Sequence, residues 1–217
     1  MGAPYCGSMK LTEAIMGKDL LGCHSNTAFR RDGLDATGTI QLYPQNPLPN
    51  NLSARKGPYL QAENANAYRL DAIYGDDTGP FLPATFVLCD VYERQMASGQ
   101  KTGMPILYYK ANTANNLHDP NAAGSMSITN NAGNIYNYYD NQALIDLGKP
   151  WQSADATQTT PHNLADPLRF FKNIRSDKIS TTDRPVKADS YILMSAGWDG
   201  EYGTADDICN FDWKYKP

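Results

Sequence analysis

Short apolar runs alternate along this chain with long polar stretches rich in glycine, proline and asparagine. In Leu11–Leu21, apolar side chains recur at helical spacing with charged residues between them, which predicts a helix ended by Gly22. A second helix is predicted after Asp166-Pro167, because aspartate caps a first turn well and proline fits its first position. Asn141–Gly148 predicts a third, shorter helix.

Three runs dense in β-branched, aromatic and other apolar residues predict buried strands. They are Thr85–Tyr92, Met104–Lys110 and Ser190–Met194, and Phe211–Tyr215 is a candidate fourth strand. Strand and helix do not alternate regularly, so we expect antiparallel pairing rather than repeated βαβ units. The expected fold class is therefore α+β: an N-terminal helix packed on a small antiparallel β-sheet, with long loop insertions.

Two long polar stretches separate these elements. Phe29–Asn66 predicts a loop with one short element at most, and Ala111–Asn134 predicts an insertion or a mobile flap outside the core. We expect one domain over residues 1–217, made of a helical part (1–25), an insertion (111–188) and a last part with the final strands (189–217).

Charge and hydropathy narrow the possible partners. The chain has 19 basic and 23 acidic residues and a net charge of −4, and its basic residues form no stripe, which argues against a nucleic-acid partner. No apolar run approaches the roughly 18 residues of a membrane span. The opening Met1–Tyr5 lacks the basic head and apolar centre of a signal peptide, so an export or anchor segment would have to precede this sequence.

Four cysteines are too few for a disulfide scaffold, and no Cys-x-x-Cys or Cys/His spacing of the zinc type occurs. On one helix, Cys6 and Cys23 would stand about 25 Å apart. That distance excludes a bond between them. A bond between Cys89 and Cys209 is conceivable, and the pairing stays open.

The most informative segment is an acidic loop near the C-terminus. Asp199, Glu201, Asp206 and Asp207 fall within nine residues, together with two glycines and no basic residue. Like charges this close repel and raise one another's pKa. Ca²⁺ would remove this cost, because it takes six to eight oxygen ligands from carboxylates, carbonyls and water.

Other interpretations of this loop are weaker or remain open. Mg²⁺ requires a stricter octahedron and keeps its waters, and the ligand ladder of an EF-hand is missing. An acidic surface turn without any metal is the remaining alternative.

No catalytic motif accompanies the loop, so we expect no enzyme. Ser195 is not part of a G-x-S-x-G elbow. Adjacent turn residues such as Asp206 and Asp207 rarely face one cleft at the separation that a glycosidase needs. The three histidines lie far apart in the sequence: His24, His118 and His162.

Three segments resemble one bacterial family, in the family's own order. SAGWDGEYGTADDI, residues 195–208, resembles the calcium loop that ends the globular domain of type II secretion major pseudopilins and related pilin-like proteins. Lys56–Leu60 (KGPYL) resembles the GPYL segment that follows their N-terminal helix. Gly103–Tyr109 (GMPILYY) resembles their G-x-P-Y-x-Y strand, and Asp90–Tyr92 stands where a D-P-W sequence usually precedes it.

The resemblance implies a pilin-like fold in which Ca²⁺ clamps the loop that follows the sheet. By position, Asp199, Asp206 and Asp207 become the side-chain ligands. The carbonyl groups of Ser195 and of the stretch from Glu201 to Thr204 would complete the shell.

The resemblance also implies a structural subunit of a type II secretion or type IV pilus-like system. Such a subunit is exported, faces the periplasm or the exterior, contacts other pilin-like subunits, and is anchored in the inner membrane by an N-terminal helix absent from this chain. The family's G-F-T-L-x-E signature is missing, and Asn112–Ser190 has no counterpart in the family.

The alternative function is a surface-exposed module that binds a ligand or carbohydrate through its tyrosine-rich insertion. Tyr136, Tyr138 and Tyr139 would supply the aromatic contacts. Tyrosines of this kind also serve simply to fill the surface of a sheet.

Overall fold

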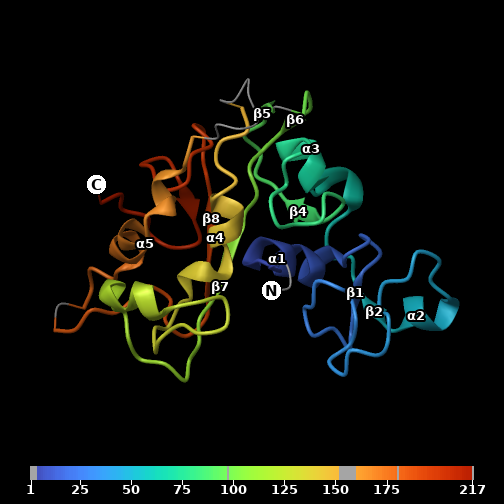
Figure 1. Ribbon diagram of the computed structural model, residues 1–217, viewed down its shortest axis with the longest axis horizontal. Coiled ribbons are helices and arrows are strands. Elements are labelled where there is room, and N and C mark those ends of the chain that lie inside the picture. The colour runs from blue at the N-terminus through green and yellow to red at the C-terminus, as the bar shows by residue number, and fades with distance from the viewer. Residues whose placement is uncertain (1–3, 97, 152–159, 180, 217) are drawn as a thin grey trace.

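The computed structural model describes residues 4–96, 98–151, 160–179 and 181–216 (Figure 1). The first three residues of the predicted helical part, and residues 152–159 and 180 of the predicted insertion, lie outside the described residues. The α-helices are α1 (Gly7–Met16), α2 (Pro49–Ser53), α3 (Leu70–Tyr74), α4 (Gln142–Ile145) and α5 (Pro167–Ile174). The 3-10 helices are η1 (Ala62–Asn64), η2 (Pro120–Ser125), η3 (Tyr138–Asp140) and η4 (Asn163–Ala165).

The strands are short and pair antiparallel throughout the described ranges, which confirms the expected α+β class and the antiparallel pairing. The largest sheet has the order β7-β8-β9, with β7 at Leu107–Lys110, β8 at Tyr191–Ser195 and β9 at Ile208–Cys209. The other strands form pairs: β1 (Cys23–His24) with β2 (Arg55–Lys56), β3 (Ala67–Arg69) with β4 (Phe86–Leu88), and β5 (Arg94–Gln95) with β6 (Lys101–Thr102).

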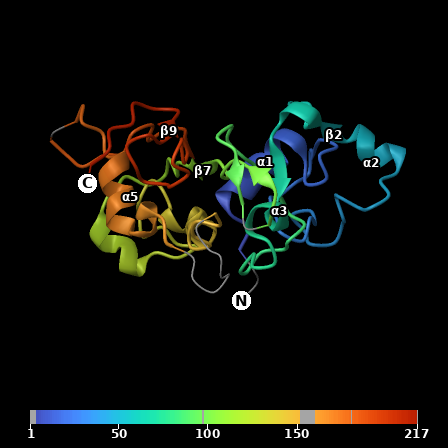
Figure 2. The ribbon, with the colours of Figure 1, turned by 90° about the horizontal axis from the view of Figure 1, so that it is seen from above.

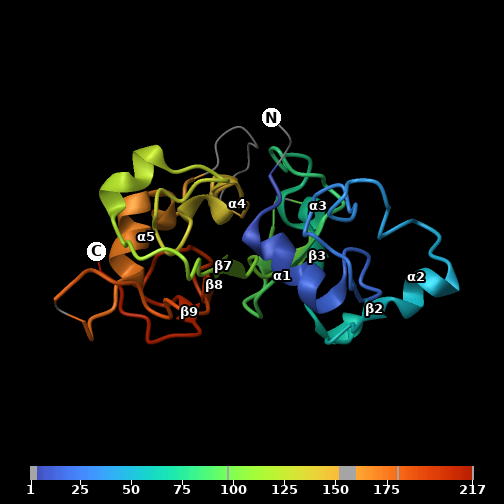
Figure 3. The same cartoon turned by 90° about the horizontal axis from the view of Figure 1, so that it is seen from below.

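Helix α1 lies between the two sides of the molecule. Figures 2 and 3 show α5 and the β7-β8-β9 sheet on one side of α1, and β1, β2 and α2 on the other. The side chain of Thr12 connects α1 to β4, because its hydroxyl accepts the backbone N–H of Leu88 at 2.9 Å. The prediction of an N-terminal helix packed on antiparallel strands is therefore confirmed, although the strands belong to separate small sheets.

The start of α1 packs directly against strand β7. The side chain of Asn141 joins them, since its Oδ1 accepts the N–H of Ser8 at 2.9 Å and its Nδ2 donates to the carbonyl of Tyr108 at 2.8 Å. A Cβ atom at Gly7 would lie 1.8 Å from the carbonyl oxygen of Tyr108. Only glycine allows the helix to approach the strand this closely.

The main core lies between β7, β8 and the helices that follow β7 in sequence. Tyr109 of β7 and Phe170 of α5 are both fully buried, with ring centroids 4.8 Å apart. Helix α5 begins as predicted, because the carboxylate of Asp166 accepts the N–H of Leu168 at 2.9 Å and Pro167 occupies the first position. The helix predicted over 141–148 is also present, but only as α4.

The first helix is displaced from its predicted bounds. It begins four residues before Leu11 and ends at Met16, where Gly17 adopts a φ of +82°. Gly22, the predicted stop, instead donates its N–H to the carbonyl of Met16 at 2.7 Å, after a tight loop. The apolar pattern at Leu20 and Leu21 thus belongs to a loop, and Leu21 is exposed.

The predicted fourth strand over 211–215 is wrong. These residues have no strand pairing, and the third strand of the sheet is β9 instead. The aromatic side chains that suggested a strand have other partners: Phe211 packs edge-on against Trp213, whose indole N–H donates to the carbonyl of Thr204 at 2.8 Å. The other three predicted strands are present: β4 and β7 have shorter bounds than predicted, and β8 is shifted by one residue toward the C-terminus.

Two predictions about the long polar stretches are also wrong. The stretch 29–66 contains α2, β2 and η1 rather than one short element at most. Part of the stretch 111–134 belongs to the core, since Met126 and Asn134 are buried and His118 contacts the carbonyl of Phe171 at 2.9 Å. Asparagine side chains in this stretch form hydrogen bonds with its backbone groups, so a segment with a polar sequence can still be buried.

Two of the three tyrosines that were expected to supply aromatic contacts are buried, and the third, Tyr139, is partly buried. Tyr136 and Tyr138 are 1% and 2% exposed, and their hydroxyls donate to the carbonyls of Lys187 and Ala165. They belong to the core. All four cysteines are free thiols, so the conceivable bond between Cys89 and Cys209 is not formed.

We expect Gly7→Ala to destabilise the protein by about 3 kcal/mol, because the added methyl group forces α1 away from β7. Chemical denaturation of the variant and the parent measures this difference. Gly124→Ala is the matched control, since a Cβ at Gly124 meets nothing within 4 Å. Equal stability of the two variants would contradict the close packing of α1 on β7.

Candidate metal centre

The acidic loop is the connection between strands β8 and β9. Ser195 pairs with Ile208 across these strands, so the residues between them close a hairpin at the edge of the sheet. Gly200 and Gly203 have φ values of +70° and +90°, which only glycine adopts readily, and they allow the chain to fold back on itself here. The loop therefore brings Asp199 near Asp206 and Asp207.

Asp90 holds the base of the loop. Its Oδ2 accepts the hydroxyl of Ser195 at 2.7 Å, and its Oδ1 accepts the N–H groups of Tyr92 and Met104, each at 3.2 Å. Asp90 is buried, and desolvation raises the pKa of its carboxyl group. The side chain of Ser195 thus positions the loop, and the sequence predicted a role only for its carbonyl.

The three aspartates of the loop accept hydrogen bonds from the loop itself. Asp206 Oδ2 accepts the N–H of Asp199 at 3.0 Å, and Asp206 Oδ1 accepts the hydroxyl of Thr204 at 2.7 Å. The carboxylate of Asp207 accepts the N–H of Gly203 at 2.8 Å and that of Thr204 at 3.3 Å. The backbone is consequently wrapped around the carboxylates.

The electrostatics of the loop centre on Asp207. This residue is only 6% exposed, and its burial, together with the charges of Asp199 and Asp206, raises the pKa of its carboxyl group to about 7. Partial burial also raises the pKa of Asp199, to which the charge of Asp206 contributes. Burial likewise opposes ionisation of Asp206, but hydrogen bonds from Thr204 and from the Asp199 N–H lower its pKa overall.

The donor set fits a hard cation by its chemistry. Within the described ranges, no lysine, arginine or histidine side chain pairs with the carboxylate of Asp199, Asp206 or Asp207. Three carboxylates and the Thr204 hydroxyl are oxygen donors of the kind that Ca²⁺ prefers. The described residues nevertheless contain no group of three or more His, Cys, Asp or Glu side chains already arranged to hold a metal.

Two cationic side chains approach the loop from elsewhere, and neither was predicted from the sequence. Arg94 of β5 donates to the backbone carbonyls of Trp198 and Asp199, the second at 2.6 Å. Lys149 forms an ion pair with the carboxylate of Glu201 at 2.6 Å, with both side chains largely buried. These cations bind backbone and Glu201 but leave the three aspartates uncompensated.

A buried histidine supports the middle of the loop. His162 Nδ1 accepts the N–H of Tyr202 at 3.2 Å, and its Nε2 lies 3.0 Å from the carbonyl of Gly148. The two rings pack with centroids 4.7 Å apart. Burial lowers the pKa of His162 to about 3, so the ring stays neutral at physiological pH.

The lowered pKa of His162 predicts a loss of stability in acid. The unfolded chain takes up a proton near pH 6.5, whereas the folded ring resists it until about pH 3. Stability should therefore fall by about 1.4 kcal/mol per pH unit between these values. We expect His162→Asn, which keeps an acceptor for Tyr202, to lose stability less steeply.

Urea unfolding of both proteins at several values between pH 7 and pH 4.5 measures this difference. His24→Asn is the comparison: His24 lies on β1, away from the loop, and burial lowers its pKa less than that of His162, so its removal should change the slope less. Parallel stability curves for the parent and His162→Asn would contradict a neutral buried ring.

Comparisons with models of known protein families, with curated proteins and with solved structures find no match to this chain. None of the described helices is long and apolar enough to cross a membrane. The case for any function therefore depends on the residues themselves.

Proposed function

We propose that this chain is a structural, calcium-binding subunit of a pilin-like assembly, of the type II secretion or type IV pilus kind. The observation that carries the proposal is the buried carboxylate of Asp207, which lies beside Asp199 and Asp206 without a cationic partner in the described residues. A divalent cation would remove the cost of ionising this carboxylate.

Asp199, Asp206 and Asp207 would hold the ion through their side chains. The carbonyl groups of Ser195 and of the stretch from Glu201 to Thr204 would complete its oxygen shell. The bound ion would supply positive charge and would order the connection between β8 and β9. Its role is structural, and we propose no catalytic reaction.

The positions of the other motifs support the proposal. The N–H of Tyr59, in the KGPYL segment, donates to the carbonyl of Ile15 near the end of α1 at 2.9 Å. The GMPILYY segment leads into and forms β7, which pairs with β8. The helix, the KGPYL segment, the strand and the acidic loop thus follow one another as they do in major pseudopilins.

The proposed subunit would be exported and would contact further pilin-like subunits through the surface that the loop presents. An apolar N-terminal helix of the full-length protein would anchor it in the inner membrane. The alternative, a binding module that uses the tyrosine-rich insertion, is less well supported, because Tyr136 and Tyr138 are buried.

We expect Ca²⁺ to raise the melting temperature of the protein relative to EGTA. At a Ca²⁺ concentration about 100 times the dissociation constant, the gain is about 2.7 kcal/mol. For a chain of this size, that gain corresponds to roughly 5–10 °C. Differential scanning calorimetry in the two buffers measures the shift.

The variants Asp206→Asn and Asp207→Asn should lose most of the Ca²⁺-dependent shift, whatever their melting temperatures in EGTA. Asp212→Asn is the control, because it removes an exposed carboxylate outside the acidic loop, whose partner is Lys214. It should keep the shift. Wild-type protein that melts identically in both buffers, and that shows no heat of Ca²⁺ binding after dialysis against a chelator, would refute the proposal.

A further inference from the structure

A cleft of about 670 Å³ lies beside the acidic loop, between Arg94 of β5 and the start of the β8–β9 connection. Its walls combine aromatic rings with charged groups. The lining residues on which the argument depends are Tyr92, Glu93, Arg94, Trp151, Trp198 and Asp199.

The aromatic wall of the cleft is unusually open to solvent. The side chain of Trp198 is 78% exposed, and that of neighbouring Val91 is 71% exposed. Tyr92 meets Trp198 edge to face, with ring centroids 6.5 Å apart. Exposed aromatic rings that line a cleft offer an apolar surface to a ligand.

The guanidinium group of Arg94 is already engaged. It lies 4.4 Å from the ring centroid of Trp151 and donates to the carbonyls of Trp198 and Asp199. A Cβ at Gly200 would lie 2.8 Å from its Cζ atom, so the loop backbone packs tightly against it. The two carboxylates that line the cleft are those of Glu93 and Asp199. The carboxylate of Asp199 accepts the N–H of Glu201 at 2.7 Å, and that of Glu93 lies beside the hydroxyl of Tyr68.

We propose that this cleft binds an organic cation, an ammonium or guanidinium group, with Trp198 and Tyr92 against its face and Glu93 as its counter-ion. Aromatic rings attract such cations through their quadrupole, as Trp151 already does with Arg94. An anion would be repelled by the two carboxylates. A neutral sugar would need hydrogen-bond donors from the protein, and the Nη1 and Nη2 groups of Arg94 already donate to the loop backbone. Glu93 lies outside the acidic loop, so the inference does not depend on the proposed metal.

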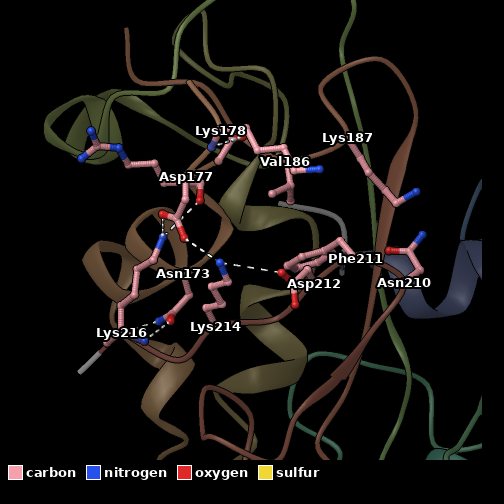
Figure 4. Close-up of a pocket in the computed structure, with 12 residues that line it drawn as sticks. Asn173, Asp177, Lys178, Val186, Lys187, Asn210, Phe211, Asp212, Lys214 and Lys216 are labelled. Carbon is pink, nitrogen blue, oxygen red and sulfur yellow. Dashed lines mark hydrogen bonds and ion pairs between the residues drawn. The ribbon is translucent and has the colours of Figure 1, made fainter. Parts of the chain in front are cut away.

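The cation has two possible sources: a free small molecule, or a basic side chain on a second copy of this chain. The molecule carries a basic cleft of about 350 Å³ elsewhere on its surface (Figure 4). There Lys214 bridges Asp177 and Asp212, and Lys216 also pairs with Asp177. In the described residues, neither Lys178 nor Lys187 forms an ion pair with a carboxylate, so both ammonium groups could reach a neighbouring copy.

The test uses the three indole N–H signals of the ¹⁵N-labelled protein in nuclear magnetic resonance spectra. Trp151 and Trp198 line the cleft, whereas Trp213 bonds to Thr204 and serves as the internal reference. We expect tetramethylammonium and arginine methyl ester to shift the Trp151 and Trp198 signals saturably, and the Trp213 signal hardly at all. Sodium chloride at equal ionic strength should have no such effect.

The variants Trp198→Ala and Glu93→Gln should each weaken binding about two- to fivefold, followed through Trp151. Glu63→Gln is the control for an exposed carboxylate far from the cleft. Unchanged affinity in both variants, or saturable shifts with a neutral disaccharide but not with the cations, would overturn the proposal. Because these titrations run equally in EGTA, their failure is separate from failure of the calcium proposal.

Sedimentation velocity distinguishes the two sources. Self-association that Glu93→Gln weakens, and that the double variant Lys178→Glu/Lys187→Glu abolishes, identifies the second copy as the source. A monomer at all concentrations, with small-cation binding retained, identifies a free molecule instead.

Discussion

The structure of the β8–β9 connection depends on how the buried carboxylate of Asp207 is stabilised. Asp207 is held inside the β8–β9 connection by two backbone N–H groups, and its two acidic neighbours oppose its ionisation. Hydrogen bonds to N–H groups lower this cost but do not cancel it, as the raised pKa shows. Near neutral pH part of the protein therefore carries a protonated Asp207, whereas a bound cation would favour the ionised carboxylate, and the proposed function follows from the ionised form.

Much of the architecture is evident in the sequence, because periodicity and capping act locally. The strands β4, β7 and β8, the Asp166 cap of α5 and the convergence of the acidic loop all follow from nearest neighbours. Contacts between residues far apart in the sequence cannot be predicted in this way. Nothing near Asn141 in the sequence indicates that its amide joins α1 to β7.

The supports of the acidic loop were missed for the same reason. Arg94, Lys149 and His162 come from three separate segments, and each lies at least 40 residues before the loop residue that it contacts, through one or two polar atoms. Single residues of these types occur throughout any chain. The only local signal was Asp90, which stands where the family resemblance expects an aspartate, and it does hold the base of the loop through Ser195.

Arg94 connects two regions that could otherwise act independently. Its guanidinium group binds the carbonyls of Trp198 and Asp199, so one end of the loop and one wall of the aromatic cleft are the same short piece of backbone. Two ligands that each restrain this piece are linked thermodynamically: the factor by which the first alters the affinity of the second equals the factor by which the second alters that of the first. Binding of Ca²⁺ and binding of an organic cation would thus each change the affinity for the other, and Arg94 would be the residue that couples them.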